Sequence, residues 1–217
     1  GGQPTGTVAN ASEALFTEDR VQLIRADGTL KTVLDVIVSP EDDATCRRTS
    51  ITNTGKKPRI IDVTSYEELV LGSPDADAMH PAFSKLFVET EYDRNLGAVL
   101  AHRRRRGPDD RNIHAAAFVV LDAAAGGTLE FETDRAKFIG RGRTLASPIS
   151  IINGRPLSGS TGAVLDPVFA LRQQVVIPPG ATVRLSFWTA VAATREALLP
   201  LIEKYRDATA FTRCATL

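Results

Sequence analysis

The chain has 217 residues, and its 26 Lys and Arg are balanced by 26 Asp and Glu, so the formal net charge is zero. This length can bury a sizeable core as one large all-β domain or two small domains, and zero net charge argues against a general nucleic-acid or membrane-surface binder. The two cysteines, Cys46 and Cys214, lack metal-ligand spacing, which argues against zinc, and two lone thiols suit a reducing compartment.

The amino terminus is expected to be an edge of the folded part. Residues 1–14 lack the charged and apolar regions of a signal peptide, and we expect a disordered or trimmed edge there. No apolar run in the chain approaches the ~20 residues that a membrane-spanning helix needs.

Short runs of β-branched and apolar residues recur along the chain, separated by turn residues. In residues 21–38, Asp27-Gly28 lies between two apolar runs and suits a type I′ hairpin, whose central residues both need positive φ. Regular polar turns between short strands are typical of a sandwich. We expect strands within residues 21–38, 45–53, 58–71, 84–93, 97–104, 114–122, 128–133, 168–178 and 181–193.

The last of these strands shows the alternation most clearly. Val183, Leu185 and Phe187 alternate with the side chains of the other face, so we expect one face to be buried. After it the apolar period changes to that of a helix over residues 194–207, with Thr194 as N-cap and a kink at Pro200. The chain is therefore predicted to be one domain of antiparallel strands followed by one helix.

Several charged clusters are candidate sites. Residues 103–111, RRRRGPDDR, carry their own counter-charges and predict a solvated hairpin tip. A glycosidase needs two carboxylates ~5–9.5 Å apart, and strand spacing places such pairs on one face, although any polar strand face does the same. The candidate pairs are Glu89 with Glu91 and Glu130 with Glu132.

The remaining polar and aromatic candidates carry weak signals. None of His80, His102 and His114 accompanies a nucleophile motif such as GxSxG, so a catalytic triad is not indicated. Single aromatic residues on strands either stack on sugars or fill the core. The aromatic candidates are Tyr66, Tyr92 and Trp188.

The stretch ETDRAKFIGRGRTL, residues 132–145, interrupts the strand pattern. Its cations and two glycines suit an anion or sugar contact, or an ordinary solvated loop. The charged residues concerned are Asp134, Arg135, Lys137, Arg141 and Arg143.

Several stretches carry a resemblance to a known family. RRTSITNTGKKPRIIDVTSYEELVL resembles the N-terminal sandwich of cellobiose-phosphorylase-like glycoside hydrolases. The closer resemblance is to cyclic β-1,2-glucan synthases, and it is carried by TSYEELVLGSPDADAMHPAFSKLFVETEY, ETDRAKFIGRGRTLASP and LSGSTGAVLDPVFALRQQVVIPPG. The resemblance covers roughly residues 15–210. It implies an all-β, antiparallel two-sheet supersandwich, similar to galactose mutarotase, over residues 15–193, with a linker helix starting in residues 194–217.

The resemblance also implies a function. In this family the acid and the phosphate-binding residues for inverting phosphorolysis of β-glucan lie in an (α/α)6 barrel, so we expect a non-catalytic domain without cofactor or metal. The implied partners are a β-glucan oligosaccharide, the barrel of the same polypeptide and, as a further option, a second copy in a homodimer, but no nucleic acid. The implied location is the cytoplasmic face of the bacterial inner membrane, within a membrane-anchored synthase that also has a glycosyltransferase region.

With this resemblance, the loop GRGRT is hypothesised to reach towards the rim of the barrel's active site. The candidate sugar or rim contacts are Asp134, Arg135, Arg141, Arg143 and Trp188. The alternative is a domain-packing loop in which Asp134 pairs with Arg135 or Arg143.

Two rival functions stay open on the sequence. A mutarotase-type enzyme would need His102 or His114 to converge with Glu130 or Glu132. A pure dimerisation module would need an exposed apolar face without a concave polar groove.

Overall fold

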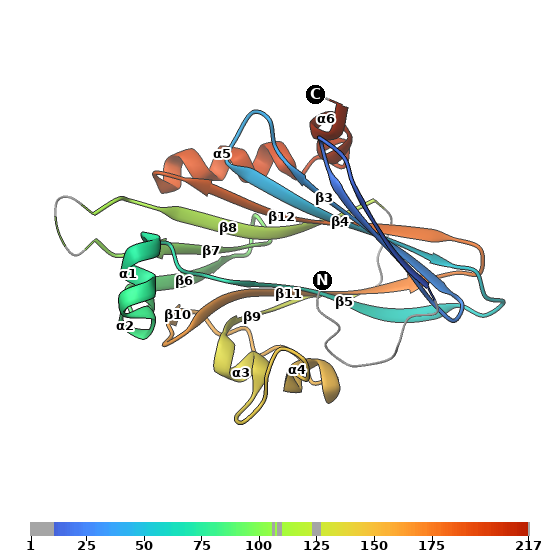
Figure 1. Cartoon of the computed structure of the whole chain (residues 1–217), viewed down its shortest axis with the longest axis horizontal. Coiled ribbons are helices and arrows are strands. Elements are labelled where there is room, and N and C mark those ends of the chain that lie inside the picture. Colours follow the sequence, from blue (N-terminus) through green and yellow to red (C-terminus); the bar gives the residue numbers. More distant parts are fainter. Residues whose placement is uncertain (1–10, 106, 108–109, 123–126, 217) are drawn as a thin grey trace.

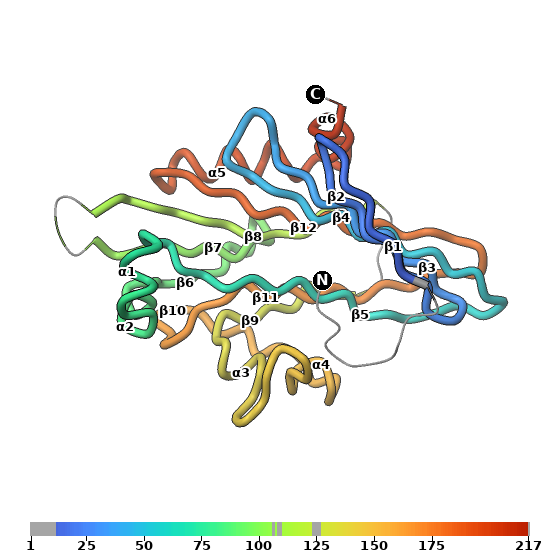
Figure 2. Tube along the Cα trace, viewed as in Figure 1, coloured from blue at the N-terminus to red at the C-terminus, as the bar shows by residue number. Residues whose placement is uncertain are grey.

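A computed structural model describes residues 11–105, 107, 110–122 and 127–216 of the chain. Two antiparallel sheets face each other, as Figures 1 and 2 show. The larger sheet has the strand order β1-β2-β3-β4-β12-β8-β7-β6-β10, and the smaller one β5-β11-β9. The predicted two-sheet antiparallel sandwich is therefore confirmed.

The bounds of ten strands follow the predicted segments closely, whereas β1 and β10 lie in no segment that was predicted as a strand. The first six strands are β1 (Ala11–Phe16), β2 (Val21–Asp27), β3 (Leu30–Val38), β4 (Ala44–Asn53), β5 (Arg59–Glu68) and β6 (Val88–Asp93). The others are β7 (Ala98–Arg103), β8 (His114–Leu121), β9 (Leu129–Asp134), β10 (Gly162–Ala163), β11 (Pro167–Ile177) and β12 (Thr182–Ala192). Since β1 starts at Ala11, the disordered edge expected over residues 1–14 is wrong for its last four residues, and residues 1–10 lie outside the described part.

Six helices accompany the described strands. They are α1 (Pro74–Met79), α2 (Pro81–Lys85), α3 (Arg135–Ile139), α4 (Ile149–Ile152), α5 (Arg195–Tyr205) and α6 (Ala210–Thr216). Only α5 was predicted as a helix, and α2 takes up the first residues of the strand expected over residues 84–93. The Thr194 hydroxyl caps α5 by accepting a hydrogen bond from the Ala197 amide at 3.1 Å, as predicted.

The hairpin between β2 and β3 is where it was predicted, but its turn differs. Asp27 pairs with Leu30, so the two central residues are Gly28 and Thr29. Only Gly28 has a positive φ, of 57°. A type I′ turn needs two such residues, so that prediction is wrong; glycine at the first central position is the pattern of type II′.

Three apolar layers hold the fold together. One lies between the sheets and includes Val99, Phe169 and Leu185. The second lies between the outer face of the larger sheet and helices α5 and α6, and it contains both free cysteines. The third lies between the smaller sheet and α3. Helices therefore cover part of the outer face of each sheet (Figure 1).

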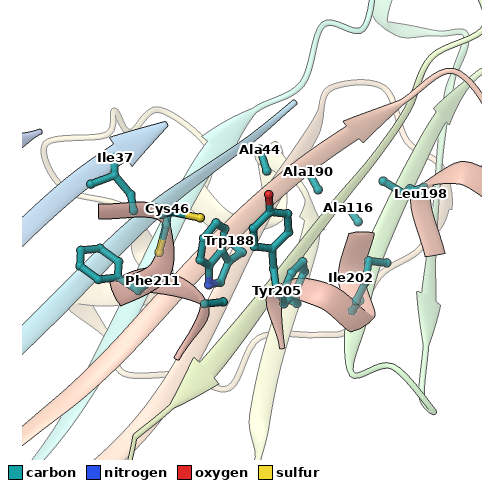
Figure 3. Packing of buried hydrophobic residues seen from close by; sticks show 14 of the residues in the cluster. Ile37, Ala44, Cys46, Ala116, Trp188, Ala190, Leu198, Ile202, Tyr205 and Phe211 are labelled. Carbon is teal, nitrogen blue, oxygen red and sulfur yellow. The ribbon is translucent and has the colours of Figure 1, made fainter. Parts of the chain in front are cut away.

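Strand β12 is buried on both faces, which corrects the one-sided burial expected from its alternation. Leu185 and Phe187 point into the layer between the sheets, while Trp188 lies in the layer under the helices with 1% of its surface exposed. Its ring stacks on that of Tyr205 from α5, with centroids 4.4 Å apart (Figure 3). Packing of α5 against the sheet explains why the second face is apolar as well.

Candidate functional site

The stretch around GRGRT begins as a capped helix rather than a loop. Asp134 is the last residue of β9, and its carboxylate accepts hydrogen bonds from the Ala136 amide at 2.8 Å and the Lys137 amide at 3.4 Å. An aspartate in this position satisfies amides that the first helical turn leaves free. Asp134 is thus the N-cap of α3, and its expected pairing with Arg135 or Arg143 is not what the structure shows.

Arg135 holds this helix to two other segments. Its Nε donates to Glu68 Oε1 of β5 at 2.9 Å, and its Nη1 lies 3.6 Å from Asp166 Oδ2. The hydrogen bond to Glu68 raises the pKa of Arg135. Burial disfavours the charged form of Glu68, but the hydrogen bonds from Arg135 and Tyr66 outweigh it and lower the pKa of that carboxyl. Arg135 is therefore a structural anchor in this chain.

The two arginines of GRGRT differ in their surroundings. Arg143 Nη1 donates to the Ser147 carbonyl at 3.2 Å and so closes the loop on itself. Arg141 is exposed, and within the described residues its side chain makes no hydrogen bond or ion pair. Gly140 and Gly142 have φ values of 88° and 69°, which favour glycine, and the exposed Arg141 lies between them in the segment that joins α3 to α4.

A cleft of about 780 Å³ opens beside α3 and the segment that joins it to α4. Residues 62–66 of β5 form one wall, and Leu145, Pro148 and Ile151 extend it towards α4. The other wall belongs to the larger sheet and includes Leu34, Thr49 and Phe187. Sequence reasoning missed this cleft, because nothing in the sequence shows that β5 is an edge strand.

Tyr66 lies in the cleft but is already engaged. Its ring stacks on Phe138 with centroids 5.0 Å apart, and its hydroxyl donates to Glu68 Oε1 at 3.1 Å. Burial is the main reason why the pKa of Tyr66 is raised. Tyr92 likewise stacks on Phe131, 4.4 Å away between centroids. One ring face of each tyrosine is thus occupied by a phenylalanine. Trp188 is 1% exposed and offers no ring face to a sugar, so for Trp188 the prediction of a sugar contact is wrong.

The pair Glu130 and Glu132 holds a loop. Glu130 Oε2 accepts from the Leu157 amide at 3.0 Å, and Glu132, 2% exposed, accepts from the amides of Thr133 and Asp134 and from the hydroxyl of Ser158. Burial disfavours the charge of Glu132, but the hydrogen bonds outweigh it and lower the pKa of that carboxyl. A carboxylate held ionised by several donors is poorly suited to act as a general acid.

The histidines lie on the opposite side of the molecule. His102 and His114 are cross-strand neighbours on β7 and β8, with ring centroids 5.6 Å apart. They alternate with Val99 and Ala115, which face the second sheet, so the histidines face outwards. Burial, with repulsion from His102, lowers the pKa of His114.

The two groups of candidates therefore do not meet. On β9, Leu129 and Phe131 pack between the sheets, so Glu130 and Glu132 point to the outer face of the smaller sheet. The histidines point to the outer face of the larger sheet. Both sheets and the apolar layer between them separate the histidines from the glutamates, which leaves no mutarotase-like convergence among these four residues.

Glu89 and Glu91 are ion-paired rather than arranged around a cavity. Glu89 Oε1 lies 2.9 Å from Arg104 Nε, and Glu91 pairs with Arg195. Arg103 is buried, and its Nη1 donates to the Ser84 carbonyl at 2.6 Å, so the first residue of RRRRGPDDR is not solvated as expected. Residues 106, 108 and 109 of that cluster lie outside the described part.

Within the described ranges, no group of three or more His, Cys, Asp or Glu side chains is placed to hold a metal ion. Among the helices of those same ranges, none is long and apolar enough to cross a membrane.

Known proteins share both the sequence pattern and the fold. The supersandwich domain of glycosyl hydrolase 94 matches residues 1–208. Cyclic beta-(1,2)-glucan synthase NdvB of Rhizobium meliloti (strain 1021) is 40% identical over 196 residues, which cover 90% of this chain and 7% of that protein. The chain thus corresponds to a small part of this curated relative.

Solved structures agree on the fold alone. A candidate kojibiose phosphorylase from the human microbiome has a TM-score of 0.52 at 6% identity, over 91% of this chain and 22% of that one. A polysaccharide lyase has a TM-score of 0.47 at 15% identity, over 83% of this chain and 23% of that one.

Proposed function

The chain belongs to the glycosyl hydrolase 94 supersandwich family, and we propose that it is a non-catalytic, carbohydrate-associated domain of a cyclic β-1,2-glucan synthase or a related β-glucan phosphorylase. In this proposal an (α/α)6 barrel elsewhere in the longer polypeptide carries out inverting phosphorolysis of β-glucan. The barrel and a β-glucan oligosaccharide are then the partners of the domain, at the cytoplasmic face of the bacterial inner membrane. The 40% identity to a cyclic beta-(1,2)-glucan synthase and the small share of that protein's length that this chain spans support this proposal.

The observation that carries the non-catalytic role is the placement of the titratable side chains. His102 and His114 face out from one sheet and Glu130 and Glu132 from the other, and both glutamates hold the loop at residues 157–158. General acid–base chemistry needs groups within hydrogen-bonding reach of one reacting atom. These four residues do not provide such a constellation.

Anomer interconversion tests the rival mutarotase activity. We expect this chain to leave the rate of glucose mutarotation, followed by polarimetry, at the buffer value. A rate increase that His114→Ala abolishes, with the fold intact by circular dichroism, would show that the chain is an enzyme in its own right.

We further propose that Arg141 reaches the rim of the barrel's active site and binds a sugar hydroxyl, a phosphate or a barrel carboxylate. Its exposure, and the lack of a partner for its side chain within the described residues, support this role. Charge-assisted hydrogen bonds are worth about 1.5–3 kcal/mol. Arg141→Ala in the longer protein is therefore expected to lower kcat/KM for phosphorolysis by about ten- to a hundredfold, with little change in Tm.

Two variants calibrate that measurement. Arg143→Ala removes the bond to the Ser147 carbonyl and should act through the shape of the loop, while Lys56→Ala removes an exposed cation from the turn before β5. Lys56→Ala should leave kcat/KM unchanged. Equal rates for Arg141→Ala and the unsubstituted protein would eliminate the proposed role of Arg141.

A further inference from the structure

The two edge strands of the smaller sheet, β9 and β5, differ in what lies along their outer edges. The outer edge of β9 is covered by residues 159–160: the Phe131 carbonyl accepts from the Gly159 amide at 2.9 Å, and the Thr133 hydroxyl donates to the Ser160 carbonyl at 2.8 Å. The pairing of β9 with β11 also contains a register shift near Pro167. Covering loops and bulges are common ways to block an edge strand.

Strand β5, at the other edge, has none of these features. It pairs with β11 in an unbroken register of ten residue pairs, from Arg59 to Glu68. Within the described residues, no backbone hydrogen bond leads from residues 59–68 to anything outside the sheet. Residues 63–66 contain neither a charge nor a proline. Such a strand offers a free row of amides and carbonyls for pairing.

The cleft described above lies along this free edge. Five consecutive residues of β5, 62–66, line it. Since alternate side chains of a strand point to opposite faces, a run of consecutive residues means that the backbone edge itself forms the wall. Polar contacts tie β5 to the larger sheet near both of its ends, from Arg59 to Thr29 and from Glu67 to Arg47, and the open stretch lies between them.

Across the cleft, the larger sheet extends beyond the smaller one. Leu34 lines the cleft, and by register Leu23 pairs with Leu34 while Phe16 pairs with Val21 on the same face. Phe16 is 72% exposed, and Val38 on this face of β3 is 67% exposed. Nine strands oppose three. Arg47 and Thr49 lie among these apolar side chains, and a sheet face that exposes large apolar side chains normally packs against a second layer.

We propose that the cleft beside β5 binds one extended strand of polypeptide, supplied by the same longer protein from outside this chain, which pairs with β5 and extends the smaller sheet. A strand paired with β5 would lie ~4.8 Å from it and ~10 Å from the facing sheet. Its backbone would satisfy the free edge, and its alternate apolar side chains would cover Leu34 and the neighbouring apolar face.

The surroundings favour polypeptide over the other occupants. A sugar has no amide and carbonyl row to match that of β5, and the ring of Tyr66 is already stacked on Phe138. The other polypeptide occupant is a second copy of the chain, paired through its own β5 edge, and photo-crosslinking from Leu34 separates it from a segment outside residues 1–217. Since this chain spans 7% of its glucan-synthase relative, most polypeptide that could supply the strand lies outside it. The inference rests on the proposed function only in assuming such a longer protein.

Site-specific photo-crosslinking in the longer protein tests the proposal. p-Benzoylphenylalanine is placed at Leu34, which faces the cleft, or at Lys31, which is exposed on the opposite face of the same strand. Mass spectrometry of the Leu34 variant is expected to identify one segment outside residues 1–217, five to seven residues long with alternating apolar side chains. The Lys31 variant is expected not to label that segment.

Hydrogen exchange on the unsubstituted longer protein gives a second readout, which does not depend on how the probe is tolerated. If a strand pairs with β5, the alternate amides of residues 62–66 that point away from β11 exchange at least about tenfold more slowly than those of an open edge. Crosslinks from Leu34 only to residues 1–217 of a second copy, or fast exchange of these alternate amides, would overturn the proposal. Neither readout uses activity or sugar binding, so failure here would leave the proposed function untouched.

Discussion

Replacing Trp188 by alanine separates a core residue from a sugar platform. The ring is 1% exposed and stacks on Tyr205 at 4.4 Å. A buried aromatic ring removes 150–250 Å² from water, or about 4–6 kcal/mol at ~25 cal/mol per Å², and measured losses for such truncations are about 3–5 kcal/mol. We therefore expect Trp188→Ala to lower the free energy of unfolding by about 4 kcal/mol and the Tm by about 8–16 °C.

Urea unfolding followed by far-UV circular dichroism measures this loss, because Trp188 is the only tryptophan and its fluorescence disappears with it. Met79→Ala, at a side chain that is 71% exposed, is the control and should change stability by less than about 0.5 kcal/mol. The assignment of Trp188 to the core would be refuted if the Trp188→Ala variant bound glucan more weakly while its free energy of unfolding stayed within about 1 kcal/mol of that of the unsubstituted chain.

Three further substitutions test local features. Glu132→Gln should lower the free energy of unfolding by about 2 kcal/mol at pH 7. Because folding lowers the pKa of Glu132, its carboxylate stabilises the fold above the unfolded pKa of about 4.3, and this stabilisation is lost as the pH falls through the folded pKa. The difference in unfolding free energy between the variant and the unsubstituted chain should therefore be smaller at pH 3 than at pH 7. Gly140→Ala should lower the Tm more than Gly142→Ala does, because a Cβ at Gly140 would lie 3.0 Å from Ile149 whereas a Cβ at Gly142 would meet open space. Equal Tm values for the two variants would contradict this. Thr194→Ala should cost about 1 kcal/mol in urea, with Thr194→Ser restoring most of it; no loss would mean that the cap is not needed.

Much of the sheet structure could be predicted because its signals are local. Alternation and turn residues mark the strands from residue 21 onwards except the two-residue β10, and the apolar spacing after Thr194 marks α5. The four short helices of four to six residues were missed, since such lengths hold too few turns to show a helical period. For α3 a signal was present: Asp134 directly before RAKFI is a good N-cap residue.

The candidate site depended on long-range contacts that the sequence does not contain. Trp188 alternates like a surface residue on β12, and only the return of α5 over the sheet buries it. Arg135 carries the same charge as Arg141, yet only Arg135 finds Glu68, 67 positions away along the chain. Whether β5 lies at an edge depends on strand order, and the cleft beside it follows from that order.

The most direct test of the central claim is an NMR time course of this chain with linear β-1,2-glucan and phosphate. The account predicts saturation transfer from protein to glucan, without formation of glucose 1-phosphate and without faster exchange between anomers. Formation of glucose 1-phosphate, or accelerated anomer exchange, would contradict the non-catalytic role. An absence of saturation transfer from a well-folded chain would contradict its association with carbohydrate.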